Sequence, residues 1–560
     1  MLEVFPPALV LLAGAALGAV TRGTLRNAVV LLAPLATLYL VWQVPDGVPY
    51  TLQFLDYATE PVEGSPVRRL FATIFAFMAF AGALFAFRQA RWYELTAAHA
   101  YAAGAVGVSF AGDLITLFVY WEVMALFSTV VVWCGESSRA RWAGIRYVAI
   151  HLLGGVILKV GIEGVMVHTG SIDVQPMALN NFDTWMLLIG VLVNVAAVPI
   201  SAWLPDAYPA SSPTGSVFLS AFTTKTAILA LILLFPGTGV LVPIGLVMIF
   251  YGIIYALLEN DVRRILAYSV VNQVGFMVCA VGIGTEMALN GAAAHAFAHI
   301  IYKALLFMSA GVVIYRTGEN LCSSLGGLYR TMPVTTVCGI IGALAISSFP
   351  LTSGFTTKSL ISEAAHVEHM PVVYFLLAAA SAGVFLHAGI KFPWFVFFQK
   401  DSGLRPKDAP WNMSAAMILM AAACLLLGVF PGPLYELLPY PVDYEPYKAS
   451  KVVFYLQLLL FSGLAFFLML PWMQRTLTIT LDVDWLWRRG LPLAWAAGTR
   501  MMDRVRRRLT DRLGAVGRVA GSQLGRLFGP AGVLGRSWEI GTTALWVALM
   551  LTAYVLVYYF

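Results

Sequence analysis

Charged residues are scarce in this chain. Only 11% of its 560 residues are Asp, Glu, Lys or Arg, whereas 60% are hydrophobic, and the mean hydropathy is +0.80. A soluble domain carries about 25% charged residues, so the composition excludes a soluble globular protein. The apolar runs are continuous and do not alternate with polar residues, which favours membrane-spanning helices over a barrel.

Cysteines and cofactor motifs are also few. The five cysteines form no CxxC pair, so neither a zinc site nor an iron–sulfur cluster is indicated. No glycine-rich phosphate loop and no flavin or dinucleotide fingerprint occurs, because Gly326-Gly327 is too short a signal. We therefore expect no metal and no cofactor, and any redox chemistry would have to be done by other subunits.

The predicted fold is an all-α polytopic membrane protein with about sixteen transmembrane helices. A helix needs ~20 apolar residues to cross a bilayer. Such runs lie near residues 7–21, 28–43, 70–88, 95–110, 113–134, 145–168, 185–204, 216–235, 239–258, 265–284, 290–315, 334–363, 371–398, 412–430, 451–470 and 540–559. Glu3 is the only early charge, so the first run lacks a cationic flank and we expect no cleaved signal peptide.

The runs predict an organisation in six parts. Two of these parts are groups of five spans each. In chain order the parts are an N-terminal transmembrane lead-in (1–90), a first five-helix repeat (91–236), a second five-helix repeat (237–400), additional transmembrane helices (401–474), an Arg-rich amphipathic segment (475–536) and a C-terminal transmembrane anchor (537–560). Within the lead-in, the polar loop from Pro45 to Arg69 has an alternating pattern that is compatible with a hairpin.

Each five-helix group contains one span that is interrupted by proline. The first interruption covers residues 198–208 and the second covers residues 348–358. Proline removes a backbone donor and kinks a helix. Two such spans, five apart, favour inverted repeats with broken helices around a midplane site, although membrane helices also tolerate proline without any such role.

The Arg-rich segment 475–536 holds twelve arginines and four aspartates, an excess larger than the net charge of +6 of the whole chain. Basic residues that flank spans favour the cytoplasmic face, and the pattern near Met501–Leu509 is typical of an amphipathic helix on a membrane surface. Glycines between 514 and 535 weaken a single straight helix, so several short pieces are an equal alternative. Nucleic-acid binding is a poor alternative for a stretch tethered between two spans.

Ionisable side chains within the apolar runs are the main functional signal. A charge at the bilayer centre costs at least ~2.5–3.5 kcal/mol, so such residues face a partner or a water-filled path. Glu122 lies in the middle of the fifth span and is either a structural ion pair or a proton-binding carboxylate. Lys225 has roughly ten apolar residues on either side, which makes snorkelling to the interface difficult.

A stripe of polar residues follows one face of the eleventh span. His295, His299 and Lys303 are each four residues apart, a spacing that puts them on one helix face. Histidine titrates near neutral pH, which favours a proton relay over structural packing. Two histidines four apart could also bind a metal, but no carboxylate or cysteine lies nearby in the run to complete a zinc site.

Further candidates lie near the interruptions and in neighbouring spans. Lys358 follows the break at Pro350–Gly354, where freed backbone groups can line an aqueous cavity. Lys159 and Glu163 are four apart and could simply pair with each other. Lys391 and His387 lie four apart in the thirteenth span, and we keep Lys391 as a possible contributor.

At these residues the chain resembles a known family. The segments that carry the resemblance are Trp121-Glu122-Val123-Met124, Trp203-Leu204-Pro205-Asp206-Ala207, Leu266-Ala267-Tyr268-Ser269, His299 to Phe307 and Ser353 to Lys358. They look like the antiporter-like subunits of respiratory complex I, and even more like the D-type subunit of the multisubunit Mrp Na+/H+ antiporters. The resemblance covers roughly residues 70–400.

The resemblance implies a fourteen-helix core of two inverted five-helix repeats with a hydrophilic midplane axis. It implies that Glu122 is the glutamate of the fifth helix and Lys225 the lysine of the eighth. His295, His299 and Lys303 match the histidine–lysine relay. Lys358 matches the ionisable residue of the broken twelfth helix.

One position departs from the family pattern. Where the family usually has a lysine before the proline of the seventh helix, this chain has Asn194. Asparagine cannot titrate, so either Lys225 or Lys159 would pair with Glu122, or the first half-channel would conduct differently. The Arg-rich segment 475–536 and the last span resemble, by architecture alone, the lateral helix and anchor of the largest antiporter-like subunit.

The sequence therefore predicts a transporter subunit, and not an enzyme, of a bacterial inner membrane that moves protons, in exchange for Na+ or another monovalent cation. Its partners would be other membrane subunits and the lipid bilayer. One alternative is a proton-pumping subunit of a complex I-like dehydrogenase or membrane-bound hydrogenase. Another is a proton-coupled module for uptake of a different solute, with a soluble partner docked on the Arg-rich segment.

Overall fold

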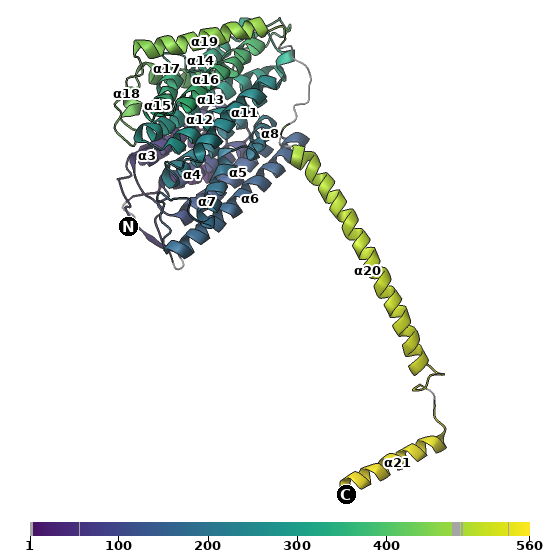
Figure 1. Ribbon diagram of the computed structural model, residues 1–560. Helices are drawn as coiled ribbons and strands as arrows, with labels where there is room; N and C mark the ends of the chain where they lie inside the picture. The colour runs from purple at the N-terminus through teal and green to yellow at the C-terminus, as the bar shows by residue number, and fades with distance from the viewer. Residues whose placement is uncertain (1–3, 55–56, 473–481, 483–484, 536, 560) are drawn as a thin grey trace. The chain divides into compact units, whose positions relative to one another are not determined.

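The computed structural model describes residues 4–54, 57–472, 482, 485–535 and 537–559, and nearly all of them lie in helices or short connections (Figure 1). By their internal contacts the residues divide into two units, 1–483 and 484–560. The all-α class is confirmed. The helices of the first unit are α1 (Pro7–Val20), α2 (Gly23–Val41), α3 (Pro66–Ala86), α4 (Trp92–Phe110), α5 (Leu114–Trp133), α6 (Ser138–Thr169), α7 (Phe182–Val195), α8 (Trp203–Ala207), α9 (Gly215–Leu219), α10 (Thr223–Leu234), α11 (Leu241–Leu258), α12 (Val262–Ile283), α13 (Glu286–Thr317), α14 (Pro333–Ile346), α15 (Ser353–Val367), α16 (Pro371–Val384), α17 (Trp411–Val429), α18 (Gly432–Tyr435) and α19 (Ala449–Met469).

Within the described ranges, thirteen helical segments are long and apolar enough to cross a membrane, and α1 and α14 are shorter apolar helices. The chain is thus a multi-pass membrane protein, while the expected count of about sixteen spans is not confirmed. The predicted hairpin is present, because β1 (Leu52–Phe54) and β2 (Tyr57–Thr59) pair antiparallel.

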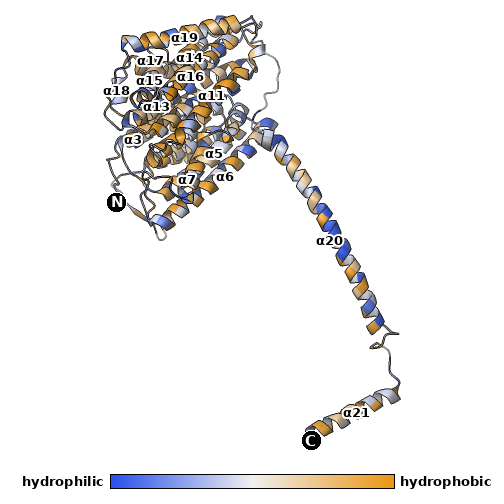
Figure 2. Cartoon of the chain, viewed as in Figure 1, coloured by the Kyte–Doolittle hydropathy of each residue, from blue (hydrophilic) through white to orange (hydrophobic). Residues whose placement is uncertain are grey.

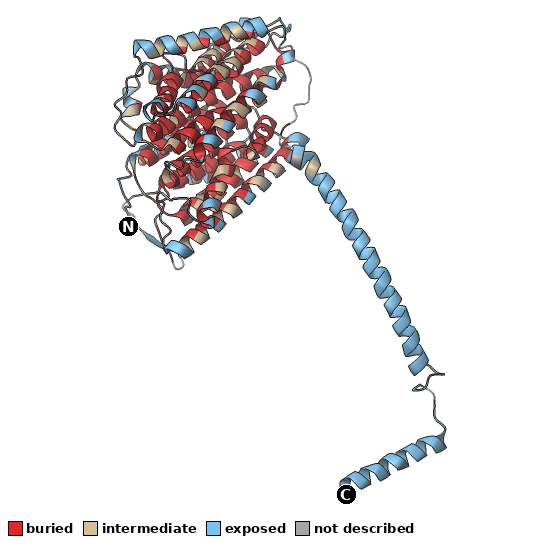
Figure 3. Cartoon of the chain, viewed as in Figure 1, coloured by how far each residue is buried: buried red, intermediate tan, exposed pale blue. Residues whose placement is uncertain are grey.

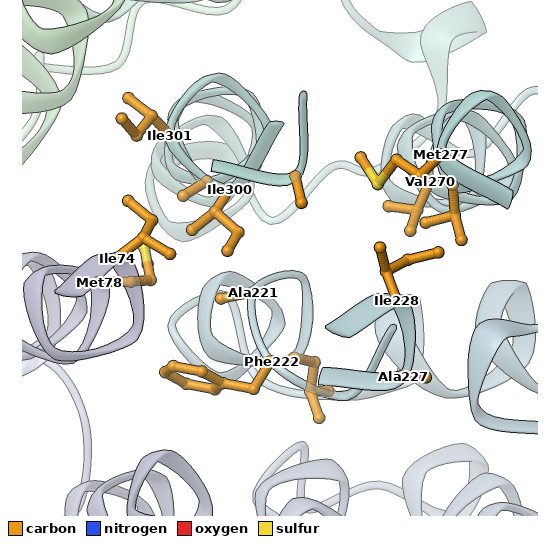
Figure 4. Packing of buried hydrophobic residues seen from close by; sticks show 14 of the residues in the cluster. Ile74, Met78, Ala221, Phe222, Ala227, Ile228, Val270, Met277, Ile300 and Ile301 are labelled. Carbon is orange, nitrogen blue, oxygen red and sulfur yellow. The ribbon is translucent and has the colours of Figure 1, made fainter. Parts of the chain in front are cut away.

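The centre of the first unit is built from α12 and α13, whose side chains are buried along most of both helices (Figure 3). Helix α13 packs against α3, α12, α14, α15 and α17. Aliphatic side chains close the packing: Ile228 of α10 points toward Val270 and Met277 of α12 (Figure 4). The polar side chains of α10, α12 and α13 are buried among these aliphatic residues.

Both proline-interrupted spans are broken helices. The first is α7, followed by the short turns η1 (Ile200–Ala202), α8 and η2 (Tyr208–Ala210), and the second is α14 followed by α15. Non-glycine residues adopt positive φ in both breaks, Ala196 in the first and Ser348 and Leu351 in the second. Such conformations cost roughly 1–3 kcal/mol each and persist where the surrounding structure fixes them.

A third break was not predicted. The span expected at 216–235 is two helices, α9 and α10, with residues 220–222 between them. A further irregularity follows α16, where η5 (Phe385–Lys391) and η6 (Trp394–Phe398) are π-helical. Single π turns within helices occur frequently at functional sites.

The second unit contains η7 (Leu486–Gly490), α20 (Leu491–Phe528) and α21 (Ile540–Tyr559). The Arg-rich segment 475–536 lies partly outside the described residues. Over residues 491–528 it is one continuous 38-residue helix, α20, and not several short pieces. Hydrophilic and hydrophobic residues alternate along α20, whereas α21 is mainly hydrophobic (Figure 2). Within this unit neither helix has a buried residue.

Candidate functional site

Lys225 lies in the first turn of α10 and is completely buried. Its Nζ donates to the carbonyl oxygen of Ser220 at 2.7 Å. This carbonyl lies in the break between α9 and α10, where the helical partners of main-chain oxygens are lost. The break therefore supplies a negative partner for a buried ammonium group.

Lys358 repeats this arrangement in the second half of the chain. It lies in α15 just after the break, and its Nζ donates to the carbonyl of Ile346, the last residue of α14, at 2.9 Å. The ammonium group also lies 4.9 Å from the ring centroid of Phe276. The negative end of a helix dipole and an aromatic face both favour a cation at this place.

The predicted stripe on α13 forms a connected polar cluster. Lys303 Nζ donates to Ser269 Oγ of α12 at 2.9 Å. His295 lies 3.1 Å from Gln273 Oε1 through Nε2 and 3.2 Å from Thr357 Oγ1 through Nδ1. His299, fully buried between them, has no hydrogen-bond partner on either ring nitrogen among the described residues.

The structure brings five of the six predicted site residues together. His299 lies within electrostatic range of Lys225, His295, Lys303 and Lys358, and Lys303 is within range of both other lysines. These side chains come from α10, α13 and α15, which lie on both sides of the boundary between the predicted repeats.

Glu122, the sixth residue, is separate from this cluster. It is half-buried on α5, and its Oε1 has no hydrogen-bond partner among the described side chains and backbone groups. Neither lysine that was considered as its partner contacts it, because Lys159 pairs with Glu163 at 2.6 Å and Lys225 binds Ser220. A β-carbon at Gly155 of α6 would lie only 1.9 Å from Glu122 Oε1, so the carboxylate rests directly on the α6 backbone.

Asn194 is buried near the end of α7, and neither its Oδ1 nor its Nδ2 has a partner in the described part of the chain. Buried polar groups of proteins are normally hydrogen-bonded to protein or to ordered water. Close by in the chain, Asp206 of α8 forms a two-point ion pair with Arg146 of α6, at 2.7 and 3.0 Å.

Lys391 lies in the π-helical segment η5, fully buried. Its Nζ donates to three carbonyls around the end of α11, those of Ala256, Leu257 and Glu259, at 2.6–2.8 Å. A lysine held by three acceptors has no free proton to give away without leaving them unsatisfied. Lys391 is therefore better suited to carry a fixed positive charge than to transfer a proton.

Sequence reasoning missed several partners. Gln273 of α12 accepts from Tyr302 at 3.2 Å and contacts His295, and Thr357 contacts the other ring nitrogen of His295. The signal for Gln273 was available, since Asn272 and Gln273 are adjacent amides inside an apolar run. Among the residues that the structure describes, no three His, Cys, Asp or Glu side chains gather in a way that could hold a metal ion.

Chemically, the arrangement is a row of groups that can bind and release protons inside an apolar shell. Lysine and histidine exchange protons through nitrogen lone pairs, and hydroxyl and amide groups between them can relay hydrogen bonds.

The region that contains these residues is similar to known proteins. Residues 111–385 match the family model described as NADH:quinone oxidoreductase/Mrp antiporter, transmembrane.

Residues 111–385, just under half of the chain, are thus similar to that family. All six predicted site residues lie within the matched region. A relative is the D-type subunit of the Na+/H+ antiporter of Alkalihalophilus pseudofirmus, which is 26% identical over 417 residues, covering 70% of this chain and 83% of the relative.

Two solved structures share the fold. One is the Mrp complex from Dietzia sp. DQ12-45-1b, with a TM-score of 0.67 at 22% identity, covering 81% of this chain and 95% of the matched one. The other is an archaeal respiratory membrane complex, the membrane-bound sulfane sulfur reductase, with a TM-score of 0.71 at 23% identity, covering 98% of this chain and 99% of the matched one. The shared fold thus covers most of the chain in both comparisons.

Proposed function

We propose that this chain is the proton-translocating membrane subunit of a multisubunit monovalent cation (Na+)/H+ antiporter. The observation that carries the proposal is a cluster of five buried titratable side chains in which His299 lies within electrostatic range of the other four, Lys225, His295, Lys303 and Lys358. Charges of this kind inside a membrane are expensive and are kept where they serve ion or proton movement. The likeness to the D-type subunit of an Na+/H+ antiporter supports the choice of cation.

In this proposal the cluster works as a relay in two parts. Glu122 and Lys225 act as the switch of the first half, and the stripe on α13 passes protons on to Lys358. Each lysine has an acceptor that can hold its ammonium form, a carbonyl for Lys225 and Lys358 and a hydroxyl for Lys303. A lysine that leaves its acceptor can release its proton to a neighbour, so transfer and small side-chain movements are coupled.

The partners are other membrane subunits of a hetero-oligomer in the bilayer. Both solved structures that share the fold come from multisubunit membrane complexes. We assign the complex to a bacterial inner membrane, and we regard the chain as a transporter subunit without catalytic chemistry of its own.

A second candidate function is supported by the likeness over 98% of the chain to a component of a respiratory membrane complex. In that case the same cluster would pump protons in a redox-driven complex. The two candidates differ in the driving force and in the partner subunits, while the proton pathway is common to both.

The discriminating experiment is purification of the intact complex in a gentle detergent, followed by proton-flux measurements in vesicles. An antiporter subunit is expected to purify with other small membrane proteins, and an imposed Na+ gradient should drive proton movement. Iron–sulfur or flavin proteins in the complex, together with flux driven only by an electron donor, would move the function to the redox-driven pump. Absence of any proton movement under both conditions would overturn the proposal.

A further inference from the structure

Among the described residues Glu122 forms no hydrogen bond or ion pair with a member of the buried cluster, which leaves a gap between Glu122 and Lys225. The contacts of His151 and of its helix, α6, lead toward both of these residues. His151 is 1% exposed. Its Nδ1 lies 2.8 Å from the carbonyl of Tyr147, whereas its Nε2 is buried without a partner in the described structure. Since a carbonyl can only accept, Nδ1 carries the hydrogen in the neutral ring, and Nε2 keeps a free lone pair. This nitrogen can therefore accept a proton.

His151 lies on the face of α6 that Glu122 contacts. Gly155 lies four residues further along α6, and residues four apart share one helix face. A β-carbon on Gly155 would overlap Glu122 Oε1, at 1.9 Å. The carboxylate of Glu122 on α5 thus contacts the face of α6 that carries His151, about one helical turn from it.

The other side of His151 leads toward α10. Its ring stacks on Tyr147 with a centroid separation of 4.0 Å and meets the edge of Trp203 at 4.5 Å. The hydroxyl of Tyr147 donates to Ser128 at 2.9 Å and also interacts with Thr223. Thr223 begins α10, two residues before Lys225.

We propose that His151 is a proton-carrying residue between Glu122 and Lys225. Its Nε2 accepts a proton given up by the Glu122 carboxyl group. The same Nε2–H bond then breaks as the proton passes through the hydroxyl groups at the start of α10 to the neutral amine of Lys225, so the neutral ring is restored and Nδ1 keeps its hydrogen on the Tyr147 carbonyl. The inference rests on the proposed function and adds a residue to its pathway. Nearby, Asn194 on α7 offers polar atoms but no titratable group, and Gly154 of α6 packs against its neighbour Val193.

The test is proton flux in vesicles that contain the assembled complex, normalised to the amount of complex. His151→Gln should reduce the flux at least roughly tenfold, because a positioned proton-transfer group typically contributes 10²–10⁴-fold. Adding Asn194→Lys in the same chain should restore at least about half of the lost flux, since a titratable amine then stands beside the gap. The control is His366→Gln, on an exposed residue of α15, which should leave the flux unchanged.

Wild-type flux in His151→Gln would overturn the inference, provided that Lys225→Ala is inactive in the same assay. A loss that Asn194→Lys does not restore would also overturn it, because a purely structural histidine gives that result. Wild-type flux in Lys225→Ala would instead contradict the proposed function itself, so the two failures are distinguishable.

Discussion

Main-chain carbonyls hold three of the buried lysines of this molecule. Lys225 and Lys358 each bind one carbonyl at a helix break, and Lys391 binds three around the end of α11. A helix C-terminus presents unpaired carbonyls and the negative end of the dipole, so it can stabilise a cation where no carboxylate is available. Lys225 and Lys358 have one carbonyl acceptor each and can leave it, whereas Lys391 is held in place by three.

Lys391→Met is therefore expected to weaken the fold more than the transport chemistry. The change leaves buried carbonyls at the end of α11 without their donor, at a cost of about 1–3 kcal/mol for each unsatisfied group. The thermal midpoint of the purified protein in detergent should fall clearly. Lys400→Met, on an exposed lysine that follows η6, is the matched control and should leave the midpoint unchanged. An unaltered midpoint in Lys391→Met would show that the carbonyls find other donors.

The positions of the ionisable residues could be predicted from the sequence, but their partners could not. Lys225, Lys303 and Lys358 stand out because each interrupts an apolar run. The acceptor of Lys225 is a carbonyl in a break that contains Ser220, Ala221 and Phe222, with neither proline nor glycine to signal it. A main-chain acceptor depends on local backbone geometry, which side-chain identity does not encode at this position.

At the scale of elements, the breaks decide where the polar groups lie. The proline-containing interruptions at 198–208 and 348–358 were predicted because proline cannot continue a helical ladder. The resulting turns bring Asp206 to Arg146 in one half and Lys358 to the end of α14 in the other. The inverted relation of the two five-helix groups remains a prediction, as do the boundaries of the six parts.

Gly354→Ala tests the second break. A β-carbon there would lie 1.8 Å from the carbonyl oxygen of Ala345, and a backbone atom cannot move aside as a flexible side chain can. We expect a loss of roughly 1–3 kcal/mol in stability, the usual cost of overpacking, together with reduced proton flux because α14 and Lys358 are forced apart. Gly239→Ala, where a β-carbon meets no atom within 4 Å, is the control. Equal stability of the two variants, measured by thermal unfolding in detergent, would contradict a tightly fixed break.

At the scale of the whole molecule, the chain consists of two units that differ in how much of their surface is buried internally. Asp482, close to the end of the first unit, accepts hydroxyl hydrogen bonds from Tyr251 of α11 and Tyr268 of α12. Within the second unit, α20 and α21 bury no residue against each other. Large uncovered apolar surfaces of this kind serve association with lipid or with other subunits.

A chain that lacks residues 491–560 is expected to insert into the membrane and to keep the first unit folded, because the contacts of that unit are internal. Its complex should lose one or more membrane subunits on purification in gentle detergent. The full-length chain, prepared in parallel, gives the reference composition. An unchanged set of subunits would mean that α20 and α21 serve only as lipid anchors.

If protons pass through the buried lysines and histidines, removal of the Lys225 amine must stop their movement. The measurement is proton flux in vesicles that contain the intact complex with Lys225→Ala. In Lys225→Ala the proton flux is expected to fall to background, while the amount of assembled complex stays at the wild-type level. Wild-type flux in this variant would contradict it, because the row of titratable groups would then be interrupted without consequence.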